Sequence, residues 1–89
     1  FVYGYELSDV YPNPFNPSTT INFSVSENID LSLVIYDMQG RVVQTLVNAN
    51  FAPGAYSINW NAQGFSSGIY FARLSSISNE QTQKLMLVK

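Results

Sequence analysis

The sequence predicts an all-β domain, an antiparallel β-sandwich of about seven strands, on three observations. Apolar residues recur at every second position in runs of about six residues, the period of a half-buried strand. Clusters of Gly, Pro, Asn and Ser separate the runs at the spacing typical of sandwiches. Nowhere does a helical period persist over ten residues. A chain of 89 residues can bury one core, so we expect a single domain.

The first half of the chain contains a short strand expected between Tyr3 and Val10, followed by a clear strand over residues 20–25. That strand alternates cleanly and places Ile21, Phe23 and Val25 on one face. Between these two strands lies a proline-rich stretch. We therefore divide the domain, residues 1–89, into a proline-rich lead-in segment over residues 1–18 and the main strands over residues 19–89.

The run over residues 31–37 predicts a central strand with Leu31, Leu33 and Ile35 facing inward. Its second half lacks polar residues, as expected for a strand covered on both faces. Residues 38–41 predict a tight turn, in which Gly40 can adopt positive φ and Asp37 can accept an Asx-type hydrogen bond. Residues 42–47 then return as the hairpin partner.

The second half of the chain predicts three further strands, over residues 55–60, 69–74 and 82–88, with loops over residues 48–54 and 61–68. Trp60 and Tyr70 are expected at the centre of the core. The aromatic residues outside the predicted strands are expected to fold back onto the ends of the sandwich. These are Phe15, Phe51 and Phe65.

The composition argues against several functions. The net charge is −2 and the four cations are scattered, which disfavours a nucleic-acid partner or a basic membrane-binding face. No run approaches the ~18 apolar residues of a membrane-spanning helix, so membrane insertion is not expected. The sequence has no Cys and no His, and we expect no metal site and no cofactor.

Catalysis is not expected either. General acid–base chemistry usually uses His or paired carboxylates, and the serines here have no activating base. Two carboxylates near each other at the N-terminal edge and two that flank a turn are interpreted as solvated turn residues. They are Glu6, Asp9, Glu27 and Asp30. The domain is therefore predicted not to be an enzyme.

The most unusual motif is Tyr11-Pro12-Asn13-Pro14-Phe15-Asn16-Pro17-Ser18. Its three prolines fix φ and remove three backbone donors, which predicts a stiff, extended lead-in to the first long strand. Asn13 and Asn16 are expected to bond to neighbouring backbone as Asx turns. Phe15 is expected to anchor the segment on the sandwich.

Five motifs in order resemble the type A C-terminal sorting domain of the type IX secretion system, also called the Por secretion system. The resemblance covers about residues 6–89 and implies an immunoglobulin-like sandwich. The motifs are Tyr11-Pro12-Asn13-Pro14, Gly40-Arg41-Val42-Val43, Gly54-Ala55-Tyr56, Ser67-Gly68-Ile69-Tyr70-Phe71 and Lys84-Leu85-Met86-Leu87-Val88-Lys89.

The resemblance implies a non-catalytic secretion signal that directs an attached upstream cargo protein through the type IX machinery. The cargo would pass through the periplasm, a sortase-like peptidase would cut upstream of the domain, and the cargo would reach the cell surface or the medium. Because the sequence has no initiator Met, we expect a longer parent protein with its export signal upstream. The implied recognition residues are Pro12, Asn13, Pro14, Gly54, Gly68, Lys84, Leu85, Val88 and Lys89.

These residues also have structural interpretations. The two glycines precede predicted strands and could serve backbone conformation alone, and the last strand could simply complete a sheet. An edge strand is also a surface to which a receptor can add a strand. Two other functions stay open: a carbohydrate-binding accessory module of an extracellular enzyme, which would use Phe51 and Phe65, and a structural immunoglobulin-like spacer.

Overall fold

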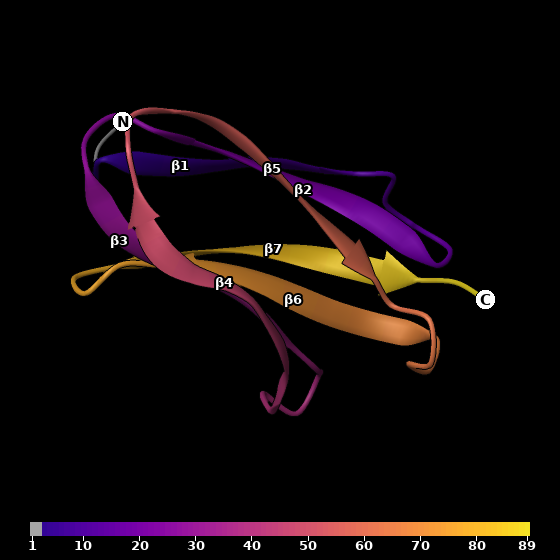
Figure 1. The fold of residues 1–89 in the computed structure, drawn as a ribbon. Helices are drawn as coiled ribbons and strands as arrows, with labels where there is room; N and C mark the ends of the chain where they lie inside the picture. The colour runs from indigo at the N-terminus through magenta and orange to yellow at the C-terminus, as the bar shows by residue number, and fades with distance from the viewer. Residues whose placement is uncertain (1–2) are drawn as a thin grey trace.

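A computed structural model describes residues 3–89 and confirms an all-β sandwich of seven antiparallel strands in two sheets. The first two residues of the lead-in segment lie outside the described residues. Figure 1 shows a three-stranded sheet above a four-stranded sheet. The strands are β1 (Tyr5–Tyr11), β2 (Ser18–Val25), β3 (Ile29–Tyr36), β4 (Val42–Phe51), β5 (Gly54–Asn61), β6 (Gly68–Ser75) and β7 (Glu80–Leu87).

The three-stranded sheet has the order β1-β2-β5 and the four-stranded sheet the order β4-β3-β6-β7. The expected central strand, β3, lies between β4 and β6. The C-terminal strand β7 is an edge strand that pairs in unbroken register with β6, from Gly68 opposite Leu87 to Ser75 opposite Glu80. Among residues 3–89, no helix is long and apolar enough to cross a bilayer.

The core forms between the two sheets as the alternation predicted. Ile21, Phe23 and Val25 of β2 face the inward side chains Leu31, Leu33 and Ile35 of β3, and all six are buried. Trp60 is fully buried at the centre, with its ring centroid 5.6 Å from that of Tyr70 in an edge-to-face contact. The core prediction is confirmed.

The prediction of a loop over residues 48–54 was wrong, because β4 continues to Phe51. Asn48 and Asn50 are turn-forming residues in isolation, but here they lie opposite Ser32 and Asp30 on the outer face of the sheet. The hydroxyl of Ser32 donates to Asn48 Oδ1 at 3.2 Å, and Asn50 Nδ2 donates to Asp30 Oδ1 at 3.1 Å. Cross-strand pairing therefore overrides the local turn preference.

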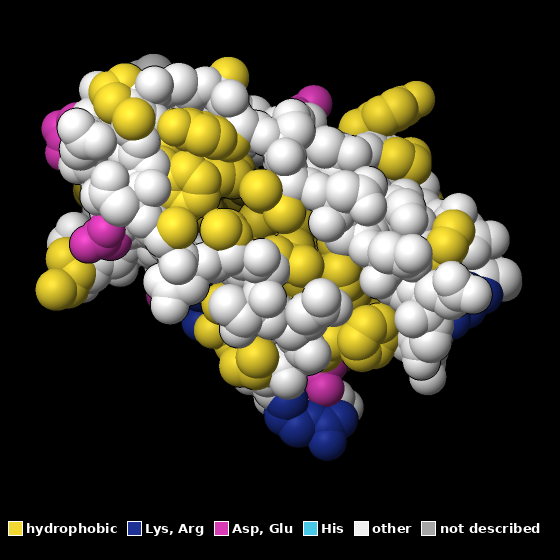
Figure 2. Space-filling view, viewed as in Figure 1, with side chains coloured by type: hydrophobic (Ala, Val, Ile, Leu, Met, Phe, Trp, Pro, Cys, Tyr) yellow, Lys and Arg dark blue, Asp and Glu magenta, His cyan; other side chains and the backbone are white. Residues whose placement is uncertain are grey.

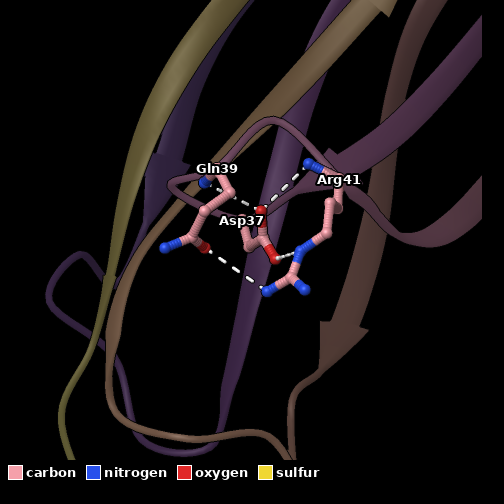
Figure 3. A network of polar contacts seen from close by, with 3 residues as sticks. All are labelled: Asp37, Gln39 and Arg41. Atoms are coloured by element: carbon pink, nitrogen blue, oxygen red, sulfur yellow. Dashed lines mark hydrogen bonds and ion pairs between the residues drawn. The ribbon is translucent and has the colours of Figure 1, made fainter.

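The turn between β3 and β4 confirms the predicted role of Asp37 (Figure 3). Its Oδ1 accepts hydrogen bonds from the backbone N–H groups of Gln39 and Arg41, both at 2.9 Å. Its Oδ2 pairs with Arg41 Nε at 2.9 Å. Gly40 has φ +83°, a left-handed conformation that side chains disfavour. The backbone hydrogen bond from Arg41 lowers the pKa of Asp37 below its ordinary value of 3.8.

Candidate recognition site at the C-terminal strand

The proline-rich segment covers the free edge of β7. The N–H of Phe15 donates to the carbonyl of Met86, and the N–H of Val88 donates to the carbonyl of Phe15, both at 2.9 Å. This forms an isolated parallel bridge between Phe15 and Leu87. The ring of Phe15 is 2% exposed and its centroid lies 5.6 Å from that of Trp60. The predicted anchoring by Phe15 is therefore confirmed.

Asn13 extends this contact through its side chain, not through an Asx turn as predicted. Its Nδ2 donates to the carbonyl of Lys84 at 2.9 Å, and its Oδ1 accepts from the N–H of Met86 at 3.0 Å. The amide group thus pairs with the edge of β7 as a neighbouring strand would. Local preference could not predict these partners, because Asn13 and Lys84 are 71 positions apart.

Pro12 and Pro14 flank Asn13 and are exposed. The backbone bends at residues 12–14 and 16–17, so the segment is not the extended lead-in that we predicted. The carbonyl of Pro12 accepts a hydrogen bond from Thr19 Oγ1 at 2.7 Å. The carbonyl of Pro17 accepts another from the N–H of Ala62 at 2.8 Å. Both carbonyls are thereby tied to the sandwich.

The first half of β7 is joined to β1 by Gln81, a residue that sequence reasoning missed. Its Oε1 accepts from the N–H of Leu7 at 2.7 Å, and its Nε2 donates to the carbonyl of Tyr5 at 3.1 Å. The Tyr5 hydroxyl donates in turn to the carbonyl of Asn79 at 3.0 Å. Burial raises the pKa of Tyr5 above its ordinary value. No sequence pattern indicates this role, because nothing distinguishes Gln81 in sequence from any other glutamine near a strand.

The structure brings most of the predicted recognition residues to one end of the sandwich. Gly68 lies opposite Leu87, next to the terminal residues, whereas Gly54 lies opposite Val25 at the far end of the other sheet. Leu85 is fully buried and serves the core. Val88 is 48% exposed, and the side chains of Lys84 and Lys89 are also exposed. The exposed members of the predicted set at this end are Pro12, Asn13, Pro14, Gly68, Lys84, Val88 and Lys89.

The two glycines share one structural device. Each begins a strand with φ near +150°, +156° for Gly54 and +151° for Gly68, in the left-handed half of φ space that favours glycine. In each case the tyrosine two positions later donates its hydroxyl to the carbonyl four residues before it, at 2.6 Å. These bonds run from Tyr56 to Ala52 and from Tyr70 to Ser66. The glycine–tyrosine motifs therefore have a complete structural explanation.

The exposed groups of this site offer hydrogen bonds, apolar contact and the positive charges of Lys84 and Lys89. Within residues 3–89, no three His, Cys, Asp or Glu side chains lie close enough together to hold a metal ion. The two aromatic residues that the alternative carbohydrate-binding function would use pack against other aromatic rings. Phe51 is buried, and the ring centroid of Phe65 lies 5.9 Å from that of Trp60 and 6.5 Å from that of Tyr70.

The chain is similar in sequence to one protein family and in fold to two solved structures. The family profile described as "Secretion system C-terminal sorting domain" matches residues 9–89. Two similar solved structures come from Porphyromonas gingivalis: dimeric latent PorU, with a TM-score of 0.69 and 18% identity, and PorZ, with a TM-score of 0.62 and 22% identity. PorZ is described as an essential bacterial surface component of the type-IX secretion system.

The match covers 94% of this chain but 9% of the PorU chain, and 91% of this chain but 11% of the PorZ chain. At these identities the likeness shows a shared fold. The chain thus spans about a tenth of the length of each of these structures. No curated protein matches the chain.

Proposed function

Because the chain belongs to the family of secretion system C-terminal sorting domains of type IX secretion, we propose that it directs an attached cargo protein through the type IX machinery. The observation that carries the proposal is the pairing of the proline-rich segment with the C-terminal strand. This pairing unites residues from both ends of the domain in one surface. A receptor would then recognise a folded domain and not a linear tail.

In this proposal the domain is a substrate of the machinery and not a catalyst. The cargo passes through the periplasm, the machinery binds the end of the sandwich that contains Asn13 and Lys89, and a sortase-like peptidase cuts upstream of the domain. The cargo is then attached to the cell surface or released. The domain contributes recognition by hydrogen bonds and shape, while the bond-breaking chemistry belongs to the peptidase.

The direct test places the domain behind a folded reporter that carries its own export signal, in a bacterium with a type IX system. The unaltered fusion should reach the surface or medium, and a fusion that lacks residues 11–89 should stay in the periplasm. Replacement of the domain by an unrelated sandwich of similar size separates signal from spacer. Export of the truncated or the replaced fusion at the normal level would contradict the proposal.

A second variant tests the composite surface. Asn13→Leu keeps the approximate size of the side chain but removes both hydrogen bonds to β7. We expect export to fall several-fold, because the segment separates from the edge of β7. Asn28→Leu, at an exposed position between β2 and β3, is the matched control and should be exported like the unaltered fusion. Equal export of both variants would show that recognition does not depend on the pairing.

A further inference from the structure

An apolar row crosses the outer face of the four-stranded sheet. Tyr36 of β3 lies opposite Val42 of β4 on one side and Phe71 of β6 on the other, and Phe71 lies opposite Lys84 of β7. The alternation in β3 and β6 points these side chains away from the core. Val42 is 60% exposed. The row lies at the end of the sheet that contains the last residues of β7 and the C-terminus.

Neighbouring rows enlarge this surface. Ile69 lies opposite Met86, which is 38% exposed. On the other side, Val34 lies opposite Arg73, whose guanidinium carbon is 4.4 Å from the centroid of the Tyr36 ring. We define the outer apolar patch as Val34, Tyr36, Val42, Ile69, Phe71 and Met86.

The outer face of the other sheet provides an internal comparison. Strands β2 and β5 present only small or polar side chains there: Ser18, Thr20, Asn22, Ser24, Ala55, Ser57, Asn59 and Asn61. Such alternation is expected for an antiparallel sheet with one face in water. Strands β3 and β6 instead present four large apolar or aromatic side chains on their outer face, Val34, Tyr36, Ile69 and Phe71, beside the polar Asp30, Ser32, Arg73 and Ser75. In Figure 1, however, no described strand covers the outer side of their sheet.

Charge is distributed just as unevenly. All four cations belong to the four-stranded sheet, its β3–β4 turn or the two residues after β7, where they outnumber Asp30, Asp37 and Glu80, whereas β1, β2 and β5 contain Glu6 and Asp9 and no cation. Arg41 pairs with Asp37, and Arg73 Nε lies 3.0 Å from Glu80 Oε2, although its N–H is not aligned for a hydrogen bond.

The lysines are different. Within residues 3–89, neither Lys84 nor Lys89 forms an ion pair. Lys84 borders the patch directly, opposite Phe71, and Lys89 follows the last strand. A surface that complements this arrangement has an apolar centre and carboxylates along the side that meets β7.

We propose that the outer apolar patch is a docking surface for a folded protein that presents an apolar area bordered by carboxylates. The inference rests on the proposed function, since it assigns this partner to the secretion machinery. The outer face of the four-stranded sheet is a better docking site for this partner than the edge of β7, because Asn13 and Phe15 already occupy that edge from Lys84 to Val88. A membrane surface is disfavoured, because two lysines on a chain of net charge −2 fall short of a polybasic cluster.

The test uses the reporter fusion with the double variant Val42→Gln, Phe71→Gln. Its export should fall at least tenfold. The control is Ile58→Gln, which replaces a half-buried apolar residue of the three-stranded sheet whose side chain points toward the core. For charge, Lys84→Glu should reduce export several-fold, while Asn59→Glu, on the opposite outer face, should not. Melting temperatures of the purified variants show whether each fold is retained.

The outcomes are distinct. If the unaltered fusion is not exported, the proposed function fails and this docking surface fails with it. If the unaltered fusion and the double variant are exported equally, the docking surface alone is overturned. If Ile58→Gln lowers export as much as the double variant at equal melting temperature, the effect is not specific to the patch and the inference is also overturned. The purified domain should not bind vesicles of anionic phospholipid. If it binds them and the double variant does not, the patch docks on a membrane and the proposed protein partner is wrong.

Discussion

The two lateral sides of the sandwich are closed in different ways. On the side formed by β1 and β7, polar groups and a chain segment join the two sheets. On the side formed by β5 and β4, apolar side chains show between the two strands, as the yellow band across the centre of Figure 2 illustrates. The apolar residues on this side are the half-buried Val43, Leu46, Tyr56 and Ile58.

The hydrogen bonds follow the same division. Gln81 makes two bonds from β7 to β1, and Asn13 and Phe15 make four to the edge of β7. Within residues 3–89, one side-chain hydrogen bond joins β5 to β4, from Trp60 Nε1 to Gln44 Oε1 at 3.0 Å. The β5–β4 side therefore depends on apolar packing.

This difference shows how the chain manages its edge strands. An exposed edge invites pairing with other chains, and proteins block it by covering it or by introducing bulges. The edge of β7 is covered, and β4 has two register shifts opposite β3. Strand β7, which borders the proposed docking surface, is thus paired with the proline-rich segment of its own chain. Its edge is not free to pair with another chain.

The largest effect should come from removing the anchor of the covered edge. Phe15→Ala deletes a buried ring and should lower the free energy of unfolding by about 3–5 kcal/mol. It should also speed hydrogen exchange at the N–H of Val88, which donates to Phe15. Denaturant unfolding and amide exchange measure the two effects.

Phe65→Ala is the control, because Phe65 also packs on Trp60 but its N–H bonds to the carbonyl of Ala62 and not to the edge of β7. It is half-buried and should cost less. The Val88 amide should keep its protection relative to global unfolding. If Phe15→Ala leaves exchange at Val88 unchanged relative to global unfolding, the covered edge is not held by Phe15.

An intermediate effect should distinguish the two sides directly. Gln81→Met leaves the N–H of Leu7 and the carbonyl of Tyr5 without their partly buried partner, at a cost of about 1–3 kcal/mol. Gln44→Met leaves one group, the Nε1–H of Trp60, without its partner, and about half that cost is expected because one hydrogen bond is lost and not two. Thermal or denaturant unfolding measures both, with Gln83→Met on β7 as a control. Equal costs at both sides would refute the distinction.

Sequence reasoning could predict most of the fold. Alternation identified the strands and the inward residues of β2 and β3, because a half-buried strand must repeat with period two. It also placed Trp60 and Tyr70 in the core and assigned the turn role of Asp37. These features depend on neighbours within a few positions, or on burial that any partner sheet would provide.

The closure of the β7 edge could not be predicted, because its partners are far apart in sequence. The Asn13 amide had an ordinary local explanation as an Asx turn, and its real partners are fixed only once β7 is in place. Gln81 is similar, since its two bonds depend on how β1 lies over β7. The same holds for β4, where Asn48 and Asn50 resemble a loop until Ser32 and Asp30 are placed opposite them.

The smallest effect concerns the turn at the end of the β5–β4 side. The pKa of Asp37 is lowered first by the backbone hydrogen bond from Arg41, with the Arg41 side chain a lesser cause. A lowered folded pKa means that this carboxylate stabilises the domain above its ordinary pKa of 3.8, and that the stabilisation is lost as the pH falls through the folded value. NMR titration of the Asp37 carboxyl carbon measures the folded pKa. Arg41→Gln removes the ion pair but keeps the backbone donor, so most of the lowering should remain, as expected for an exposed pair. A return of the Asp37 pKa to its ordinary value in that variant would show that the turn is held by charge and not by the backbone.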